Sequence, residues 1–261
     1  MGELGAVTIA LWGSLVQASW VLVRVSAFVV TAPVLGARAA PGRIRLMLAV
    51  VLTPLIAISV PPVEPPALFG SLWWLMMIIN VAVGLMLGLL LQLLFEALML
   101  SAEMISALAG LSFAQVNDPM RGTTSPVLGS MLTAFASLLF LAMDGHHALI
   151  RLLWLSFTAV PMAGQWAGPP WMALAGLLVP MLEAGISLAL PVLASLLTVQ
   201  LGFGLVSRAA PALNLFAIGL PAALLALLLL LWLWLPEMGA PLSAYWAAMF
   251  EHIGAALQAA P

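Results

Sequence analysis

Residues 68–109 read LFGSLWWLMMIINVAVGLMLGLLLQLLFEALMLSAEMISALA, and this stretch indicates what kind of fold the chain adopts. Its only charged side chains are Glu96 and Glu103. A continuous helix over this stretch would be roughly 60 Å long at 1.5 Å per residue, about twice the thickness of a bilayer's hydrocarbon core. Such a helix must extend beyond a membrane, break, or lie inside protein.

The composition of the whole chain is that of a membrane protein. Of 261 residues, 65% are hydrophobic and 6% are charged, and the mean hydropathy is +1.22. The chain has no cysteine, which excludes disulfides, thiolate metal sites and cysteine nucleophiles. It also has no run of basic residues, so nucleic acid is not an expected partner. We expect one integral-membrane domain over residues 1–261, in contact with membrane lipid.

The apolar sequence divides into about six segments, separated by proline-rich or polar turns. The fold class that they predict is an all-α polytopic membrane protein, in which some helices are long or kinked and the first helix is retained rather than cleaved as a signal. The segments are 6–35, 44–60, 68–109, 123–160 with an interruption at Asp144-Gly145, 172–203, and 213–235.

The arginines predict an orientation for these segments. Six alternating spans place five arginines on one side, which the positive-inside rule makes cytoplasmic, and both termini on the other side. Arg151 is an exception and Arg24 lies within a span. The five are Arg38, Arg43, Arg45, Arg121 and Arg208.

Two features of the long segment suggest packing against protein. Gln92, Glu96 and Glu103 fall within a narrow stripe on one helical face, which either emerges into water or faces a partner subunit or an aqueous pore. Gly84 and Gly88 form a small-xxx-small pair that lets two helices approach closely.

The run FLAMDGHHALIRLLWLSF, residues 140–157, raises the question of a metal site. His146 and His147 are neighbours that should point about 100° apart on a helix, and no third histidine lies nearby in the sequence. We therefore expect no metal and no cofactor. Instead, Asp144 is expected to cap the helix that begins at Gly145, with both histidines in its first turn at the membrane surface.

Two other classes of function have weaker support. An intramembrane hydrolase could use Gly110-Leu111-Ser112 with a histidine, but Ala114 stands where a G-x-S-x-G motif needs glycine. Asp118 and Asp144 are expected on opposite sides of the membrane, which argues against paired acid–base catalysis. A small-solute secondary transporter usually shows internal repeats, and none is convincing here.

Several motifs in their order along the chain resemble the FliR family of flagellar biosynthetic proteins, and the resemblance covers nearly the whole chain. DGHH and RAAPxLNxFAxGxP, at this spacing, are its most specific parts. Ala212 departs from the glutamine that is common in the family. The motifs are Arg24 with Pro33, Arg43, Leu48-Ala49, FEA at 95–97, Asn117-Asp118-Pro119, SPVLG at 125–129, FLAMDGHHALI at 140–150 followed by SF and Pro161, LP at 190–191, and RAAPALNLFAIGLP at 208–221.

The resemblance implies a non-enzymatic subunit of the flagellar type III export gate, in the bacterial inner membrane at the basal body. Its implied partners are the FliP and FliQ proteins, the FlhB protein, and the unfolded flagellar proteins that pass through the gate. It also implies a helical stack, part of which is raised out of the bilayer plane.

The resemblance further implies a loop inside the pore, at about 110–122, and contacts between subunits elsewhere. Apolar side chains in the loop can exclude water, and its terminal glycines permit hinge motion. The candidates for this loop are Gly110, Phe113, Val116, Asn117, Asp118, Pro119, Met120 and Gly122. The candidates for assembly contacts are Glu96, Glu103, Asp144, His146, Arg208, Pro211, Asn214, Gly219 and Pro221.

Overall fold

The structure, a computed structural model, describes residues 2–33, 41–61, 69–111, 127–162, 175–209 and 215–258. Within these ranges all regular secondary structure is helical, which confirms the predicted fold class. Five helices are long and apolar enough to cross a membrane, or six if the pair α5 and α6 counts as one broken span.

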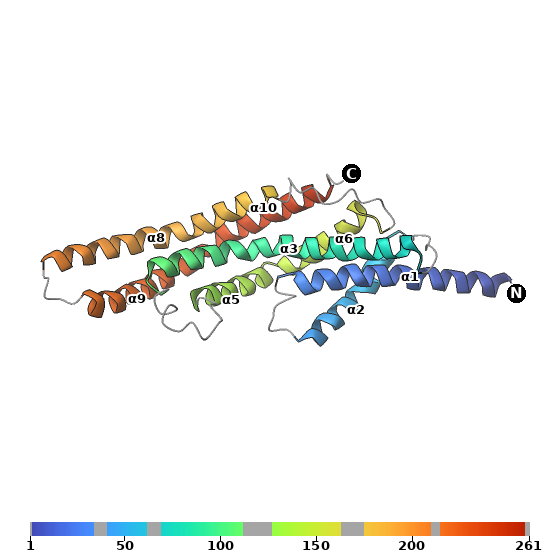
Figure 1. The fold of residues 1–261 in the computed structure, drawn as a ribbon, viewed down its shortest axis with the longest axis horizontal. Coiled ribbons are helices and arrows are strands. Elements are labelled where there is room, and N and C mark those ends of the chain that lie inside the picture. The colour runs from blue at the N-terminus through green and yellow to red at the C-terminus, as the bar shows by residue number, and fades with distance from the viewer. Residues whose placement is uncertain are drawn as a thin grey trace. The chain divides into compact units, whose positions relative to one another are not determined.

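Five of the six predicted segments agree with helical regions to within about four residues at each end, whereas the fifth, predicted at 172–203, is a helix at Leu178–Ala209, six residues further along the chain (Figure 1). Segment 123–160 divides at Asp144-Gly145, as expected, into two helices. The helices are α1 (Gly2–Thr31), α2 (Gly42–Ser59), α3 (Ser71–Leu108), α5 (Val127–Ala142), α6 (Gly145–Ala159), α8 (Leu178–Ala209), α9 (Leu215–Trp234), the short 3-10 helix η2 (Leu235–Met238) and α10 (Gly239–Gln258).

Helix α10 was missed by the sequence reasoning, which ended the last segment at residue 235. Pro236 and Pro241 suggest the end of a helix because proline lacks a backbone N–H and disrupts a helix interior. In the structure Pro236 lies at the start of η2 and Pro241 in the first turn of α10, and Pro221–Gln258 runs on as one helical span of 38 residues in spite of both prolines.

Helix α3 is continuous over 38 residues, so the predicted long segment does not break. At 1.5 Å per residue it is about 57 Å long, well beyond a hydrocarbon core of about 30 Å. Part of α3 must therefore extend out of a bilayer or be covered by protein.

The chain forms two compact units, each assembled from segments that are distant in sequence. Unit 1 consists of Met1–Leu93, Asp144–Leu177 and Phe250–Pro261, and unit 2 consists of Leu94–Met143 and Leu178–Met249. The prediction of a single domain over residues 1–261 stays a prediction.

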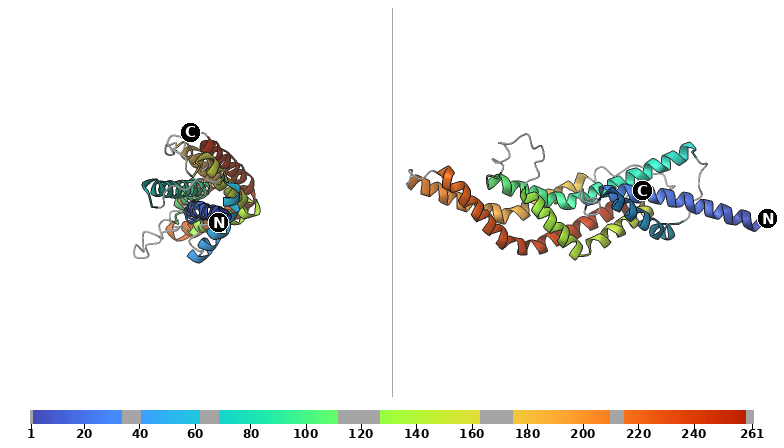
Figure 2. Two further views of the ribbon diagram at one scale, coloured as in Figure 1. Left: turned by 90° about the vertical axis from the view of Figure 1, so that its right-hand side faces the viewer. Right: turned by 90° about the horizontal axis from the view of Figure 1, so that it is seen from below.

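In unit 1, α1 lies beside the first part of α3, and α2 packs on α1 (Figure 2). The predicted close approach at Gly84 and Gly88 is confirmed, and it joins these two helices of the same chain. A Cβ atom on Gly84 would lie 2.9 Å from the Cβ atom of Ala27, and one on Gly88 would collide with the side chain of Thr31. The absence of side chains at these positions allows the two backbones to come together.

In unit 2, α8 packs against α9, and the second part of α3 meets α5 and α10 through aromatic side chains. The ring centroids of Phe95 and Phe140 lie 5.7 Å apart, and those of Phe140 and Trp246 lie 5.2 Å apart, both edge to face. The indole N–H of Trp246 donates to the carbonyl of Leu94 at 3.1 Å, so its polar atom is satisfied in the core.

Candidate functional site

Arg24 is the most deeply buried charged residue that the structure describes, with no exposed surface. Its Nε–H donates to the Oδ1 atom of Asn80 at 2.9 Å. Its two terminal nitrogens donate to the backbone carbonyls of Ser156 and Val160, at 2.8 and 2.9 Å. The guanidinium carbon lies 4.1 Å from the ring centroid of Phe157. One side chain thus ties α1 to α3 and to the end of α6.

Three local features prepare this site for a positive charge. The amide of Asn80 donates to the carbonyl of Met76 at 2.7 Å, which turns its oxygen toward Arg24. Ser156 and Val160 lie at the C-terminus of α6, where the helix dipole is negative, and the carbonyl of Ser156 also accepts the N–H of Val160 at 3.0 Å. No carboxylate among the described residues pairs with Arg24, so backbone and amide oxygens and an aromatic face compensate its charge.

Sequence reasoning placed Arg24 within a span, and its burial in α1 is consistent with that placement. The role of Arg24 was missed. The available signal was the presence of a lone charge in a long apolar segment, which marks a residue with partners in the protein interior. Its partners lie 56, 132 and 136 positions away, beyond the reach of any local pattern.

The predicted polar stripe on α3 is divided in the structure. Glu96 and Glu103 are exposed, whereas Gln92 is half-buried. The amide of Gln92 donates to the carbonyl of Thr31 at 2.8 Å and so satisfies a carbonyl in the last turn of α1. The expectation that all three residues share one outward-facing stripe was therefore wrong for Gln92.

Gly110, the first of the pore-loop candidates, ends α3 in the left-handed conformation with φ of 78°. The N–H of Leu111 donates to the carbonyl of Ser106 at 3.1 Å, and that of Gly110 donates to the carbonyl of Ala107 at 3.3 Å. This is the Schellman pattern, which favours glycine because other residues are strained at such φ values. The sequence therefore ends α3 where the pore loop was predicted to begin.

The other pore-loop candidates lie outside the described residues, as does Ser112 of the hydrolase alternative. They are Phe113, Val116, Asn117, Asp118, Pro119, Met120 and Gly122.

Among the assembly candidates in the late motif, Arg208 is exposed in the last turn of α8. Gly219 and Pro221 lie within α9. Pro211 and Asn214 fall outside the described residues. A basic residue at a helix C-terminus is electrostatically favourable, and the exposed guanidinium of Arg208 is available to other groups.

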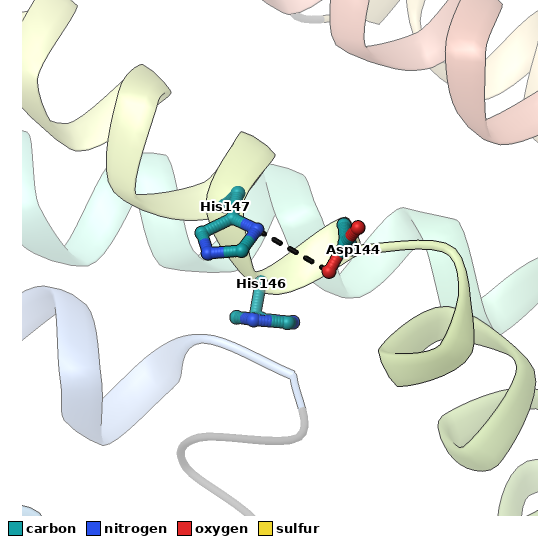
Figure 3. A group of neighbouring side chains, drawn as sticks. All are labelled: Asp144, His146 and His147. Atoms are coloured by element: carbon teal, nitrogen blue, oxygen red, sulfur yellow. Dashed lines mark ion pairs between the residues drawn. The ribbon is translucent and has the colours of Figure 1, made fainter.

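Asp144 occupies the predicted position before α6, but the capping prediction was wrong. Its backbone is left-handed, with φ of 58° and ψ of 24°, and its side chain makes no capping hydrogen bond. The carboxylate instead lies 3.4 Å from the Nδ1 atom of His147 (Figure 3). Capping requires an extended backbone that directs the side chain to the first amides, and the left-handed turn directs it elsewhere.

His146 and His147 lie in the first turn of α6, as predicted. The expectation that their side chains point apart was wrong. Their ring centroids are 4.1 Å apart. One ligand atom each from Asp144, His146 and His147 lie within 4.8 Å of one another. The Cβ atoms of neighbouring helical residues point about 100° apart. Rotation about the side-chain bonds nevertheless brings the two imidazole rings together.

Comparisons with known proteins agree with these motifs. Residues 15–249 match the family described as bacterial export proteins, family 1. The flagellar biosynthetic protein FliR of Escherichia coli (strain K12) is 38% identical over 209 residues, covering 78% of each chain. The FliR proteins of Pectobacterium carotovorum subsp. carotovorum and Bacillus subtilis (strain 168) are 37% and 32% identical, over 84% and 77% of this chain.

These matches cover most of the chain and include α3, α6 and α8, which carry the motifs described above. The helices are those of a protein embedded in a membrane. This chain therefore belongs to family 1 of the bacterial export proteins, as a flagellar biosynthetic protein of the FliR type.

Proposed function

We propose that this chain is a non-enzymatic core subunit of the flagellar type III protein export gate. It forms part of the channel through which unfolded flagellar proteins cross the bacterial inner membrane at the basal body. Its partners are FliP and FliQ, followed by FlhB. Membership of an export family supports the general role, and the surface of the long helices supports the role as one subunit among several.

The observation that carries this proposal is the exposed apolar surface of α8. This helix has 32 residues, about 48 Å of length, and is apolar over most of it. A bilayer covers about 30 Å, so the remainder needs protein cover to avoid water. The large side chains exposed along α8 are Leu178, Val179, Leu182, Ile186, Leu190, Leu197, Leu201, Leu205 and Val206.

Co-expression with FliP and FliQ, followed by purification in mild detergent through a tag on this chain, tests the proposal. We expect a stable complex that contains all three proteins. The chain reconstituted alone should move no small solute across vesicle membranes. Purification of the chain by itself under conditions that preserve other membrane complexes, together with solute transport by the lone chain, would favour a secondary transporter.

We place the closure of the channel in residues 110–122. Phe113, Val116 and Met120 can exclude water, and methionine can repack around different passengers. The Schellman end of α3 supports this assignment, because Gly110 redirects the chain away from the helix axis at the start of the loop.

Deletion of Ser112–Val116 tests the loop. The complex should still assemble, but ion conductance and sensitivity to small toxic solutes should rise severalfold. A matched deletion of five residues from another connection, 163–167, should leave conductance at the wild-type level. An assembled Ser112–Val116 deletion complex that is as tight as wild type would place closure in the partner subunits.

A further inference from the structure

We propose that Asp144, His146 and His147 form a binding site for one divalent transition-metal ion of the Zn²⁺ class at the start of α6. This site is independent of the export role. The proposal rests on the positions of three potential ligands, one carboxylate and two imidazoles, in one turn of backbone (Figure 3).

The first step is the distance between Asp144 and His147. A carboxylate oxygen and an imidazole nitrogen on one tetrahedral zinc ion, each about 2.0–2.2 Å from the metal, lie roughly 3.3–3.5 Å apart. The Oδ1 atom of Asp144 and the Nδ1 atom of His147 are 3.4 Å apart. Two ligand atoms are therefore already at the separation that coordination requires.

The second step is the position of His146. Its ring centroid is 4.1 Å from that of His147, and one ligand atom from each of the three residues falls within 4.8 Å of the others. Small side-chain rotations would bring the third ligand atom to the separation that coordination requires. Two imidazoles and a carboxylate are ligands that suit Zn²⁺, Co²⁺ and Fe²⁺, and they leave a position for water.

The third step is the unsatisfied nitrogen of His146. Its Nδ1 atom is shielded from solvent and has no hydrogen-bond partner among the described residues. A buried polar atom without a partner costs free energy, and coordination through this nitrogen would give it one.

The backbone of the turn explains why the carboxylate is available. Asp144 has φ of 58°, a conformation that costs energy for most residues and is tolerated best by glycine, asparagine and aspartate. The carbonyl of Asp144 accepts a hydrogen bond from the N–H of His147 at 2.9 Å, which closes the turn. Its carboxylate makes no cap, and the side chains of Asp144 and His147 are 72% and 70% exposed, so an ion can reach them from solvent.

The test uses the full chain in mild detergent, purified through an affinity tag without histidine and stripped with a chelator. Zn²⁺ is titrated in competition with a chromogenic chelator, and Co²⁺ is added separately to record its visible ligand-field absorption. We expect one Zn²⁺ per chain and the intense absorption of Co²⁺ at low coordination number. His147→Ala and Asp144→Asn should each weaken Zn²⁺ binding by at least about 10- to 100-fold, the loss that follows even from disturbing a ligand's supporting residues.

His252→Ala is the matched control, because His252 is an exposed histidine on α10 outside this cluster. It should bind Zn²⁺ as wild type does. His146→Gln tests the third ligand. If the His146→Gln variant aggregates, His147→Ala still tests the site, because the ring of His147 is mostly exposed and its removal should not disturb folding. Absence of saturable Zn²⁺ binding in wild type would leave only the Asp144–His147 ion pair, and equal affinity in wild type and the ligand variants would also overturn the site.

Discussion

A guanidinium buried among apolar helices is stable only where its N–H groups meet acceptors, and Arg24 meets three of them within 2.9 Å. The acceptors come from α3 and from the end of α6. The side chain of Arg24 therefore links three helices of unit 1 through hydrogen bonds. At the scale of single residues, Arg24 is the one buried charged side chain among the described residues, and these hydrogen bonds compensate for the loss of water around it.

Removal of the Arg24 side chain should destabilise the protein strongly. Arg24→Ala leaves Asn80 Oδ1 and the carbonyl of Val160 without the donor that Arg24 supplies, and it leaves the carbonyl of Ser156 with only the N–H of Val160, at a cost on the order of 2–5 kcal/mol. Arg24→Lys should recover only part of this, because an ammonium lacks the planar fork that reaches several acceptors at once. Thermal unfolding of the purified protein in detergent measures the change.

Arg43→Ala is the control for charge, since Arg43 is exposed near the start of α2. It should change stability by no more than about 0.5 kcal/mol. If Arg24→Ala unfolds at the same temperature as Arg43→Ala, the hydrogen bonds of Arg24 do not stabilise the contact of α1 with α3 and α6.

At the scale of helices, the contact of α1 with α3 depends on the absence of side chains at Gly84 and Gly88. A Cβ atom at Gly84 would collide with the carbonyl of Arg24 as well as with Ala27. Backbone atoms cannot move aside as a flexible side chain can, so the helices would have to separate. That separation would also strain the hydrogen bonds of Arg24.

Gly84→Ala should therefore destabilise the protein by about 1–3 kcal/mol, the usual cost of overpacking a core. Gly202→Ala in α8 is the matched control, because a Cβ atom there meets nothing within 4 Å. It should be neutral or stabilising by up to about 1 kcal/mol, since alanine is the better helix former. Equal effects of the two substitutions on the unfolding temperature would contradict the close-packing argument.

At the scale of the whole molecule, each compact unit combines helices that are far apart in the chain. Helix α3 contributes residues to both units, as does α10. Much of α8 and α9 remains exposed and apolar, including Leu201, Leu228 and Trp232. Such surface is stable in lipid or against other subunits, which suits a protein that functions in an assembly.

Arg208 is expected to contribute to the contact between this chain and a partner subunit. Its exposed guanidinium at the end of α8 can hold carbonyls or a carboxylate of a partner. Arg208→Ala should lower the yield of the purified complex severalfold while membrane insertion of the chain stays at the wild-type level, and Arg43→Ala should change neither. Normal assembly with loss of export would move the role of Arg208 to the channel.

The orientation predicted from the arginines also concerns the whole molecule. Cysteines introduced singly at Gly2 and Ala39 of this cysteine-free chain should react with a membrane-impermeant maleimide from opposite sides, with Ala39 cytoplasmic. Labelling of both positions from the same side would show that the proposed topology is wrong.

The sequence by itself determined that the chain lies in a lipid bilayer and where most of its helices are. Apolar content and segment length predict membrane helices because a bilayer satisfies no backbone hydrogen bonds, and α1, α2, α3, α8 and α9 followed. Gly84 and Gly88 were recognisable as a packing pair, and the division at Asp144-Gly145 was visible as a polar interruption. The motifs also led to the correct family.

The tertiary structure decided which groups meet. The partners of Arg24, the use of Gln92 at the end of α1 and the grouping of segments into two units depend on contacts between distant residues, which local periodicity does not encode. The conformation of Asp144 belongs to the same class, because a left-handed backbone is selected by the surrounding chain rather than by the residue alone. Sequence patterns reveal which side chains need partners, and only the fold supplies the partners, since it brings together atoms from helices far apart in the chain.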